Sequence, residues 1–342
     1  MKWIKRISIW MVISLSVQGL VLFYLNHYFS TIGSKVVSEM VEDDKSDKVM
    51  NIDITVPKNA ENILVSYDAK YLSYFENEEL RIANCKDGII INIEVEKGNK
   101  ISFYEWLPDR NRMLFVEKKS NNESSDLVLY SYDVAKGEKV KIKDIKWNDT
   151  KSEVENIQVS TLTGVTYVKG SNRDGVSSIY RFDRMGTMTK INTIPKFVSN
   201  IELLRHEDKL VYEGLVYNSI YVTGSYDAIT IKDVDKLMLI GNDDDDNVYL
   251  GEIKDNVTSK IYYGQISENT DEWKEIDLQN SSEKKDLFVS STGKVYQNDS
   301  LRGVVKELKS GILTSYKGEL LQLYTKGIVT LVGNKISFVY FK

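Results

Sequence analysis

The feature that most constrains the fold of this chain is a repeated series of short, strand-like apolar segments separated by turn residues. From residue 51 onward, segments of about five to seven residues alternate with turns such as Asp87-Gly88 and Lys136-Gly137. Many short strands at regular spacing predict an antiparallel sandwich, barrel or propeller. The clearest predicted strands are Gly88–Val95, Leu127–Tyr132, Ser178–Phe182, Leu210–Glu213 and Lys335–Phe341.

A longer period groups these segments into larger units. Pairs of strand-like segments, each pair joined by a short loop, recur about every 42 residues, which is the length of a four-stranded propeller blade. The predicted starts of the units are Asn62, Ile101, Asn156, Asn200, Lys236, Asp286 and Ile312. Because the gaps vary from 26 to 55 residues, six to eight blades fit the pattern, and seven fit it best. We therefore predict an all-β propeller over residues 52–342.

The composition agrees with a fold made of strands. Only five alanines, the best helix formers, occur in 342 residues, whereas the chain has 21 tyrosines, which favour strands. The single cysteine, Cys85, excludes an intramolecular disulfide and a zinc site built from several thiolates, and we expect it to be a small buried residue. The abundance of Lys, Asn and Ile is typical of a low-GC Gram-positive bacterium.

One stretch resembles a signature of known propellers. The segment Trp106-Leu107-Pro108-Asp109-Arg110-Asn111-Arg112-Met113-Leu114-Phe115 resembles the W-S-P-D-G-x-x-[LI]-x-[FY] motif of TolB-like propellers and of the propeller domains of dipeptidyl-peptidase-type proteins. Leu107 stands where the family has Ser, and Arg110 stands where it has Gly. The resemblance implies a propeller in which the Pro-Asp turn joins the two innermost strands of a blade. It implies no activity, and no segment of the sequence resembles the peptidase domain of the second family.

The N-terminus predicts a membrane span. Residues 1–6 form a basic tip that contains Lys2, Lys5 and Arg6, and residues 7–29 include no Asp, Glu, Lys or Arg. As a helix, 23 residues would extend about 34 Å, enough to cross a hydrocarbon core of ~30 Å. Basic residues stay on the cytoplasmic side of a span, so we expect the body to lie outside the cytoplasm.

A cleaved secretory signal is the alternative interpretation of this segment. The apolar stretch is longer than a usual signal core of about 7–15 residues, and no A-x-A-like cleavage site follows it. We therefore expect a retained single-pass anchor. Residues 30–51 are polar and charged, and we expect them to form a juxtamembrane linker.

Charge and motifs exclude several classes of function. The net charge is −5, and removing the three basic residues of the tip leaves about −8, which argues against nucleic-acid binding. His206 is the one histidine of the body, and no G-x-S-x-G motif accompanies it as in a Ser-His-Asp hydrolase. The run Ser291-Thr292-Gly293-Lys294 lacks the upstream glycine of a P-loop. We predict no catalytic, cofactor-binding or metal-ligating residue.

Four consecutive carboxylates, Asp243–Asp246, stand between two predicted strands. We expect them to form a solvated hairpin tip, and calcium binding through their oxygens is the alternative.

The predicted function is a membrane-anchored, non-enzymatic module that binds another protein or a component of the cell envelope. Propellers present loops and a central funnel that suit recognition. Two alternatives remain: an extracytoplasmic enzyme that uses funnel carboxylates on a carbohydrate or peptide, and a structural or sensory subunit of a membrane complex.

Overall fold

The computed structural model describes four stretches of the body and a few helical residues near the N-terminus. They are residues 54–120, 125–147, 152–324 and 326–341, with helical residues 3, 6, 10, 11 and 14–23. The chain divides into two units, Met1–Ser46 and Asp47–Lys342. No helix among the described residues is both long and apolar enough to cross a membrane. The predicted linker 30–51 and parts of the predicted span 7–29 lie outside the described residues, so the anchor stays a prediction.

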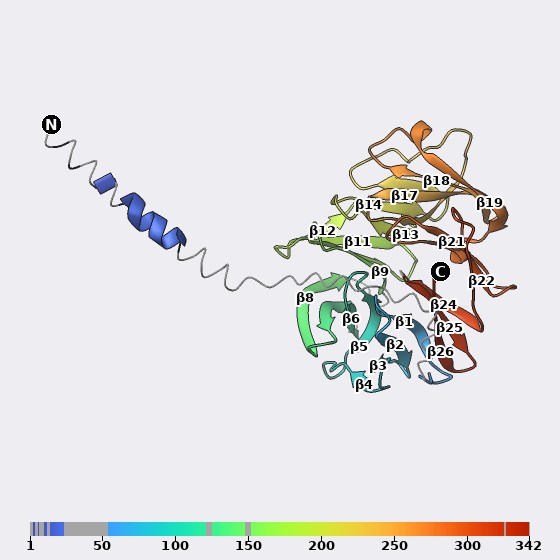
Figure 1. Ribbon diagram of the computed structural model, residues 1–342, viewed down its shortest axis with the longest axis horizontal. Helices are drawn as coiled ribbons and strands as arrows, with labels where there is room; N and C mark the ends of the chain where they lie inside the picture. The colour runs from blue at the N-terminus through green and yellow to red at the C-terminus, as the bar shows by residue number, and fades with distance from the viewer. Residues whose placement is uncertain are drawn as a thin grey trace. The chain divides into compact units, whose positions relative to one another are not determined.

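The described residues of the second unit form seven antiparallel sheets, which are the blades of a propeller (Figure 1). Five sheets have four strands and two have three. Within every sheet the strand order follows the chain order, so each blade is a meander that runs from an inner to an outer strand. This arrangement confirms the predicted all-β fold and the count of seven blades.

The strands of the first three blades have these bounds. Blade 1 contains β1 (Glu61–Val65), β2 (Tyr71–Glu76), β3 (Glu79–Asn84) and β4 (Ile90–Asn92). Blade 2 contains β5 (Lys100–Trp106), β6 (Arg112–Ser120), β7 (Ser125–Asp133) and β8 (Glu138–Trp147). Blade 3 contains β9 (Glu153–Ser160), β10 (Val165–Ser171), β11 (Ser177–Phe182) and β12 (Met188–Ile191).

The remaining four blades follow in chain order. Blade 4 contains β13 (Val198–Leu203), β14 (Leu210–Gly214) and β15 (Ser219–Val222). Blade 5 contains β16 (Leu237–Asn242), β17 (Asn247–Lys254), β18 (Val257–Gln265) and β19 (Lys274–Ser282), with the short helices η1 (Thr270–Glu272) and η2 (Lys284–Asp286) beside β19. Blade 6 contains β20 (Leu287–Val289), β21 (Val295–Asp299), β22 (Val304–Glu307) and β23 (Leu313–Ser315). Blade 7 contains β24 (Glu319–Tyr324), β25 (Gly327–Val332) and β26 (Lys335–Tyr340).

The predicted start of the seventh blade is wrong. The other six predicted starts lie within three residues of an inner strand, but Ile312 precedes β23, the outermost strand of blade 6. The inner strand of blade 7 is β24, which begins at Glu319. The error arises because a strand, a short turn and a second strand look alike in sequence whether the turn lies within a blade or between two blades.

The two faces of the ring differ in which ends of the inner strands they carry. We call the face on which the inner strands begin the entry face. It carries the first residues of these strands, Glu61, Lys100, Glu153, Val198, Leu237, Leu287 and Glu319. The opposite face, with the turns that follow the inner strands, is the exit face.

Residues 54–56 close the ring by adding a strand to blade 7. Thr55 pairs antiparallel with Lys335. The Val56 N–H donates to the carbonyl oxygen of Asn334 (2.8 Å), and the Ile336 N–H donates to that of Ile54 (3.1 Å). Figure 1 accordingly shows the red blade 7 beside the blue blade 1. The start and the end of the body therefore belong to one sheet.

Hydrophobic clusters fill the contacts between neighbouring blades. Seven clusters of described residues correspond to the seven contacts around the ring. The cluster at the closure joins Tyr324 and Phe338 of blade 7 to Leu72 and Cys85 of blade 1. This confirms that Cys85 is a buried residue. Burial of apolar area of this kind stabilises by about 25 cal/mol per Å², so each blade depends on both neighbours.

The turns of the exit face are hydrogen-bonded from one blade to the next. The side chain of Asn111 donates to Asp68 (3.0 Å), Thr161 donates to Asp109 (3.2 Å), and Ser160 donates to the carbonyl oxygen of Arg205 (2.6 Å). The Asp244 N–H donates to the carbonyl oxygen of Ser291 (2.8 Å). The Pro108-Asp109 turn joins β5 and β6, the innermost strands of blade 2, as the resemblance implied.

A disulfide across the closure should stabilise the whole body. Thr55 and Lys335 are both exposed and face each other in a non-hydrogen-bonded antiparallel pair, where side chains approach most closely. We expect Thr55→Cys/Lys335→Cys, when oxidised, to raise the melting temperature by about 5 °C relative to its reduced form. The Thr55→Cys single variant is the control. Equal melting of the oxidised and reduced double variant would contradict closure at this pair.

Candidate functional site

An exposed apolar hairpin turn stands on the entry face of blade 4. Leu215, Val216 and Tyr217 are consecutive, and 59%, 61% and 77% of their surfaces are exposed. Gly214 pairs with Val198 at the start of β13, which places the turn on this face. Runs of three exposed apolar residues are unusual on a soluble surface unless they form a contact.

Backbone hydrogen bonds hold this turn in place. The Asn218 N–H donates to the carbonyl oxygen of Gly214 (3.0 Å), and the Leu215 N–H donates to that of Phe197 (2.9 Å). A Cβ atom at Gly214 would lie 3.2 Å from the ring of Pro195, so a larger residue would push the turn away from its support. The apolar side chains are therefore presented on a fixed backbone. The sequence analysis missed this turn, although two turn-forming residues, Gly214 and Asn218, flank its apolar residues.

Two carboxylates on inner strands of different blades have raised pKa values, and one repels the other. Glu105 lies on β5 and Glu202 on β13, which are inner strands two blades apart. Desolvation raises the pKa of Glu105 to about 7, and repulsion by Glu202 adds to the shift. Desolvation also raises the pKa of Glu202 to about 7. The side chain of Glu105 is nevertheless exposed, so the surrounding protein desolvates its carboxyl without covering it.

A lysine lies beside this pair. Lys284, from η2, forms an ion pair of 3.4 Å with the buried Glu213 and also lowers the pKa of Glu202 through its charge. Desolvation lowers the pKa of Lys284 itself. Glu213 is fixed further by the side chain of Asn200 (2.8 Å) and the N–H of Leu239 (3.2 Å), both of which donate to it. Glu213 thus has hydrogen-bonding partners and an ion pair, whereas the lysine acts on Glu202 through its charge.

The expectation of a solvated acidic tip is wrong for two of the four aspartates. Asp243 and Asp246 are buried. Asp243 accepts hydrogen bonds from the N–H groups of Asp245 (3.0 Å) and Asn247 (2.9 Å), and from the Tyr249 hydroxyl (2.9 Å). Burial, followed by this hydrogen bond, raises the pKa of Tyr249. Among the described residues, no group of three or more His, Cys, Asp or Glu is placed to hold a metal ion.

Asp246 links blade 5 to blade 4. Its carboxylate accepts from the N–H groups of Arg205 (2.5 Å) and His206 (3.1 Å). The His206 ring lies 3.3 Å from the same carboxylate, and Asp244 forms an ion pair with Arg205. His206 and the acidic run Asp243–Asp246, which are separate features of the sequence, are therefore parts of one contact between blades 4 and 5.

The glycine of the Ser291–Lys294 turn also has a structural role. A Cβ atom at Gly293 would lie 2.8 Å from the Asp243 carboxylate and 2.9 Å from the Tyr249 hydroxyl, and its φ is +74°. Only glycine allows this close approach without strain. The turn is therefore packed against blade 5. This close packing explains why the turn contains a glycine, and no phosphate-binding role is needed to explain it.

Comparisons with known proteins support the fold. No protein-family model and no curated protein matches the chain. A chain in the crystal structure of the mitotic checkpoint complex is similar over 90% of this chain and 99% of its own length, with 11% identity and a TM-score of 0.50. At this identity the similarity concerns the fold alone.

Two further structures belong to the groups that the signature resembles. TolB from Acinetobacter baumannii is 18% identical over 67% of this chain and 56% of its own, with a TM-score of 0.38. A putative dipeptidyl aminopeptidase IV from Bacteroides ovatus ATCC 8483 is 13% identical over 75% of this chain and 46% of its own, with a TM-score of 0.47. The chain therefore spans about half the length of each.

Replacing Asp243 should destabilise the propeller, whereas replacing the neighbouring Asp245 should not. Asp243→Ala leaves buried donors unpaired and should cost about 2–4 kcal/mol of unfolding free energy. Asp245 has an exposed side chain, so Asp245→Ala should change stability by less than about 0.5 kcal/mol. Urea denaturation of both variants measures the difference. Equal stability of the two would contradict the structural role of Asp243.

Replacing Glu202 should change how stability depends on pH. The folded pKa of about 7 lies above the ordinary 4.5, so the folded state keeps a proton that the unfolded state releases between these values. The contribution of Glu202 to stability therefore falls as pH rises through this window. We expect the melting temperature of Glu202→Gln, measured relative to that of the parent, to increase from pH 5 to pH 8. Glu319→Gln, at an exposed position, is the control, and parallel curves for parent and Glu202→Gln would contradict the assignment.

Proposed function

We propose that this chain is a membrane-anchored, extracytoplasmic propeller that binds another protein of the cell envelope through the entry face of blade 4. The observation that carries the proposal is the exposed turn Leu215-Val216-Tyr217. An apolar group in water has an unfavourable hydration free energy, and a partner surface that covers it removes this cost. Tyrosine is also among the residues that contribute most to binding energy at interfaces.

The proposed location rests on the N-terminal sequence. The basic residues 1–6 precede the apolar residues 7–29, an order that favours a span with its N-terminus in the cytoplasm. Residues 30–51 would then separate the propeller from the bilayer. The acidic body argues for a protein or envelope partner rather than a nucleic acid.

A second candidate function is acid–base catalysis at the centre of the ring on a carbohydrate or peptide. The pKa of about 7 of both Glu105 and Glu202 favours it, because a group that titrates near neutral pH can donate and accept protons. Loss of a hydrolytic activity in Glu202→Gln, with the turn on blade 4 intact, would separate this function from binding.

Cysteine labelling on intact cells tests the location and the contact surface together. We would place Tyr217→Cys or Tyr226→Cys in the full chain and add a membrane-impermeant maleimide that carries a photo-crosslinker. Tyr226 is 87% exposed and follows the opposite end of β15, so it is a matched control. The native Cys85 is buried, and burial raises the pKa of its thiol to about 12, so it should not react.

We expect both variants to be labelled on protoplasts and only Tyr217→Cys to form a specific cross-linked product. Adding Leu215→Ser and Val216→Ser should reduce this product at least about tenfold, the effect of losing a strong interface contact. Absence of label at both positions would overturn the proposed location. Label without cross-linking, or equal cross-linking from both positions, would overturn the proposed surface.

A further inference from the structure

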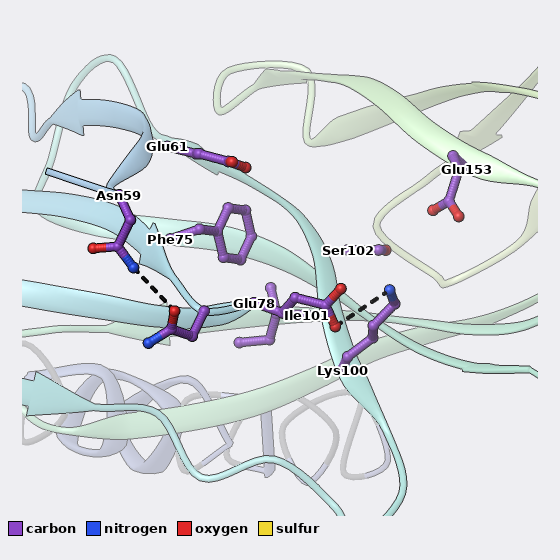
Figure 2. Close-up of a pocket in the computed structure, with 9 residues that line it drawn as sticks. Asn59, Glu61, Phe75, Glu78, Lys100, Ile101, Ser102 and Glu153 are labelled. Atoms are coloured by element: carbon purple, nitrogen blue, oxygen red, sulfur yellow. Dashed lines mark hydrogen bonds and ion pairs between the residues drawn. The ribbon is translucent and has the colours of Figure 1, made fainter.

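An open pocket of about 450 Å³ lies on the entry face where the inner strands of blades 1, 2 and 3 begin (Figure 2). Its volume falls within the range of about 300–1,000 Å³ that is usual for ligand sites. Glu61, Lys100 and Glu153, the first residues of β1, β5 and β9, contribute to its lining. The pocket is separate from the exposed turn of blade 4.

The pocket offers hydrogen-bond donors and acceptors side by side. The Asn59 amide donates to the Asn77 amide oxygen (2.9 Å), so the oxygen of the first and the NH₂ of the second stay available to a ligand. Ser102 donates only a long bond, of 3.5 Å, to the carbonyl oxygen of Val116, and its lone pairs stay available as well. Figure 2 shows Asn59 and Ser102 among the side chains that line the pocket.

An aromatic ring lies among these polar groups. Figure 2 shows Phe75 between Glu61 and Ile101. Phe75 is half-buried and packs edge-to-face on Tyr104, with ring centroids 5.1 Å apart. The adjacent turn is set by Asn77 and Glu78, whose φ values of +51° and +65° are those of a tight type I′ hairpin. The packing on Tyr104 therefore positions the Phe75 ring, and the turn positions the backbone of Asn77, before any ligand binds.

The charges of the pocket largely cancel. Glu78 lies 3.8 Å from the Lys100 ammonium, and Glu153 forms an ion pair with Lys118. Glu61 remains as the carboxylate without such a partner among the described residues. An anion would be repelled by this lining, and a strongly cationic ligand would have to compete with two lysines that are already in place.

We infer that this pocket binds a neutral carbohydrate. A sugar ring has an apolar face that can lie on Phe75, and each hydroxyl both donates and accepts, which suits a lining that mixes amides, a hydroxyl and a carboxylate. An apolar peptide side chain would find only one aromatic ring, because Ile101 is itself buried. The expectation that the sugar comes from outside the cytoplasm rests on the proposed function. Binding itself does not, because it can be measured on the purified protein.

Calorimetric titration of the purified full chain in detergent tests this inference. The probes are neutral tetramers of N-acetylglucosamine, glucose and mannose, and the cationic tetramer of glucosamine. The variants are Asn59→Ala, which removes an exposed amide, and Phe75→Leu, which removes the aromatic face and keeps a similar volume. Glu319→Gln is the control, because Glu319 is the exposed first residue of β24, an inner strand that does not line the pocket.

We expect at least one neutral tetramer to bind, with affinity about tenfold weaker in Asn59→Ala and in Phe75→Leu and unchanged in Glu319→Gln. Absence of binding by all three neutral tetramers would overturn the carbohydrate assignment. Binding of the cationic tetramer alone, abolished by salt, would replace it with simple attraction to carboxylates. Full affinity in both pocket variants would overturn the location. None of these outcomes bears on cross-linking at Tyr217, so the two proposals fail independently.

Discussion

The closure between residues 54–56 and β26 is the interaction on which the rest of the propeller depends. Each blade buries its two faces against its neighbours, so an unclosed ring would leave two apolar faces in water. The pair Thr55–Lys335 prevents this by placing the start of the body in the same sheet as its end. Tyr324 and Phe338 of blade 7 then pack against blade 1 as the other blades pack against one another. No disulfide contributes, because the chain has one cysteine.

The polar groups of the two faces serve different ends. On the exit face, Asp68, Asp109 and Asp246 each accept hydrogen bonds from a turn of a neighbouring blade. Their hydrogen-bonding capacity is thus used within the protein. On the entry face, Asn59 and Asn77 bond to each other and retain open atoms, and Leu215–Tyr217 extend into solvent. The arrangement favours recognition on the entry face and rigidity on the exit face.

Local patterns in the sequence were sufficient for the architecture but not for the site. The starts of six blades could be located because strand, turn and strand alternate within a few residues. The closure could not be located from the sequence, because its strand spans only three residues and its partner lies some 280 residues away in the chain. The burial of Asp243 depends on Tyr249 and Gly293, which a count of consecutive carboxylates does not reveal. The repulsion between Glu105 and Glu202 joins residues that are 97 positions apart, on inner strands of two different blades, so no local pattern reveals it.

Glu105 and Glu202 also make the negative charge of the protein near pH 7 smaller than its formal value. The formal net charge of −5 counts every carboxylate as ionised. Desolvation, however, raises the pKa of Glu105 and of Glu202 to about 7, so near neutral pH the pair retains part of its protons. The centre of the ring therefore carries less negative charge than the count implies, and its charge varies with small changes of pH. Both carboxylates stand next to the last residues of their inner strands, β5 and β13, so this variable charge lies toward the exit face and away from the residues where the inner strands begin.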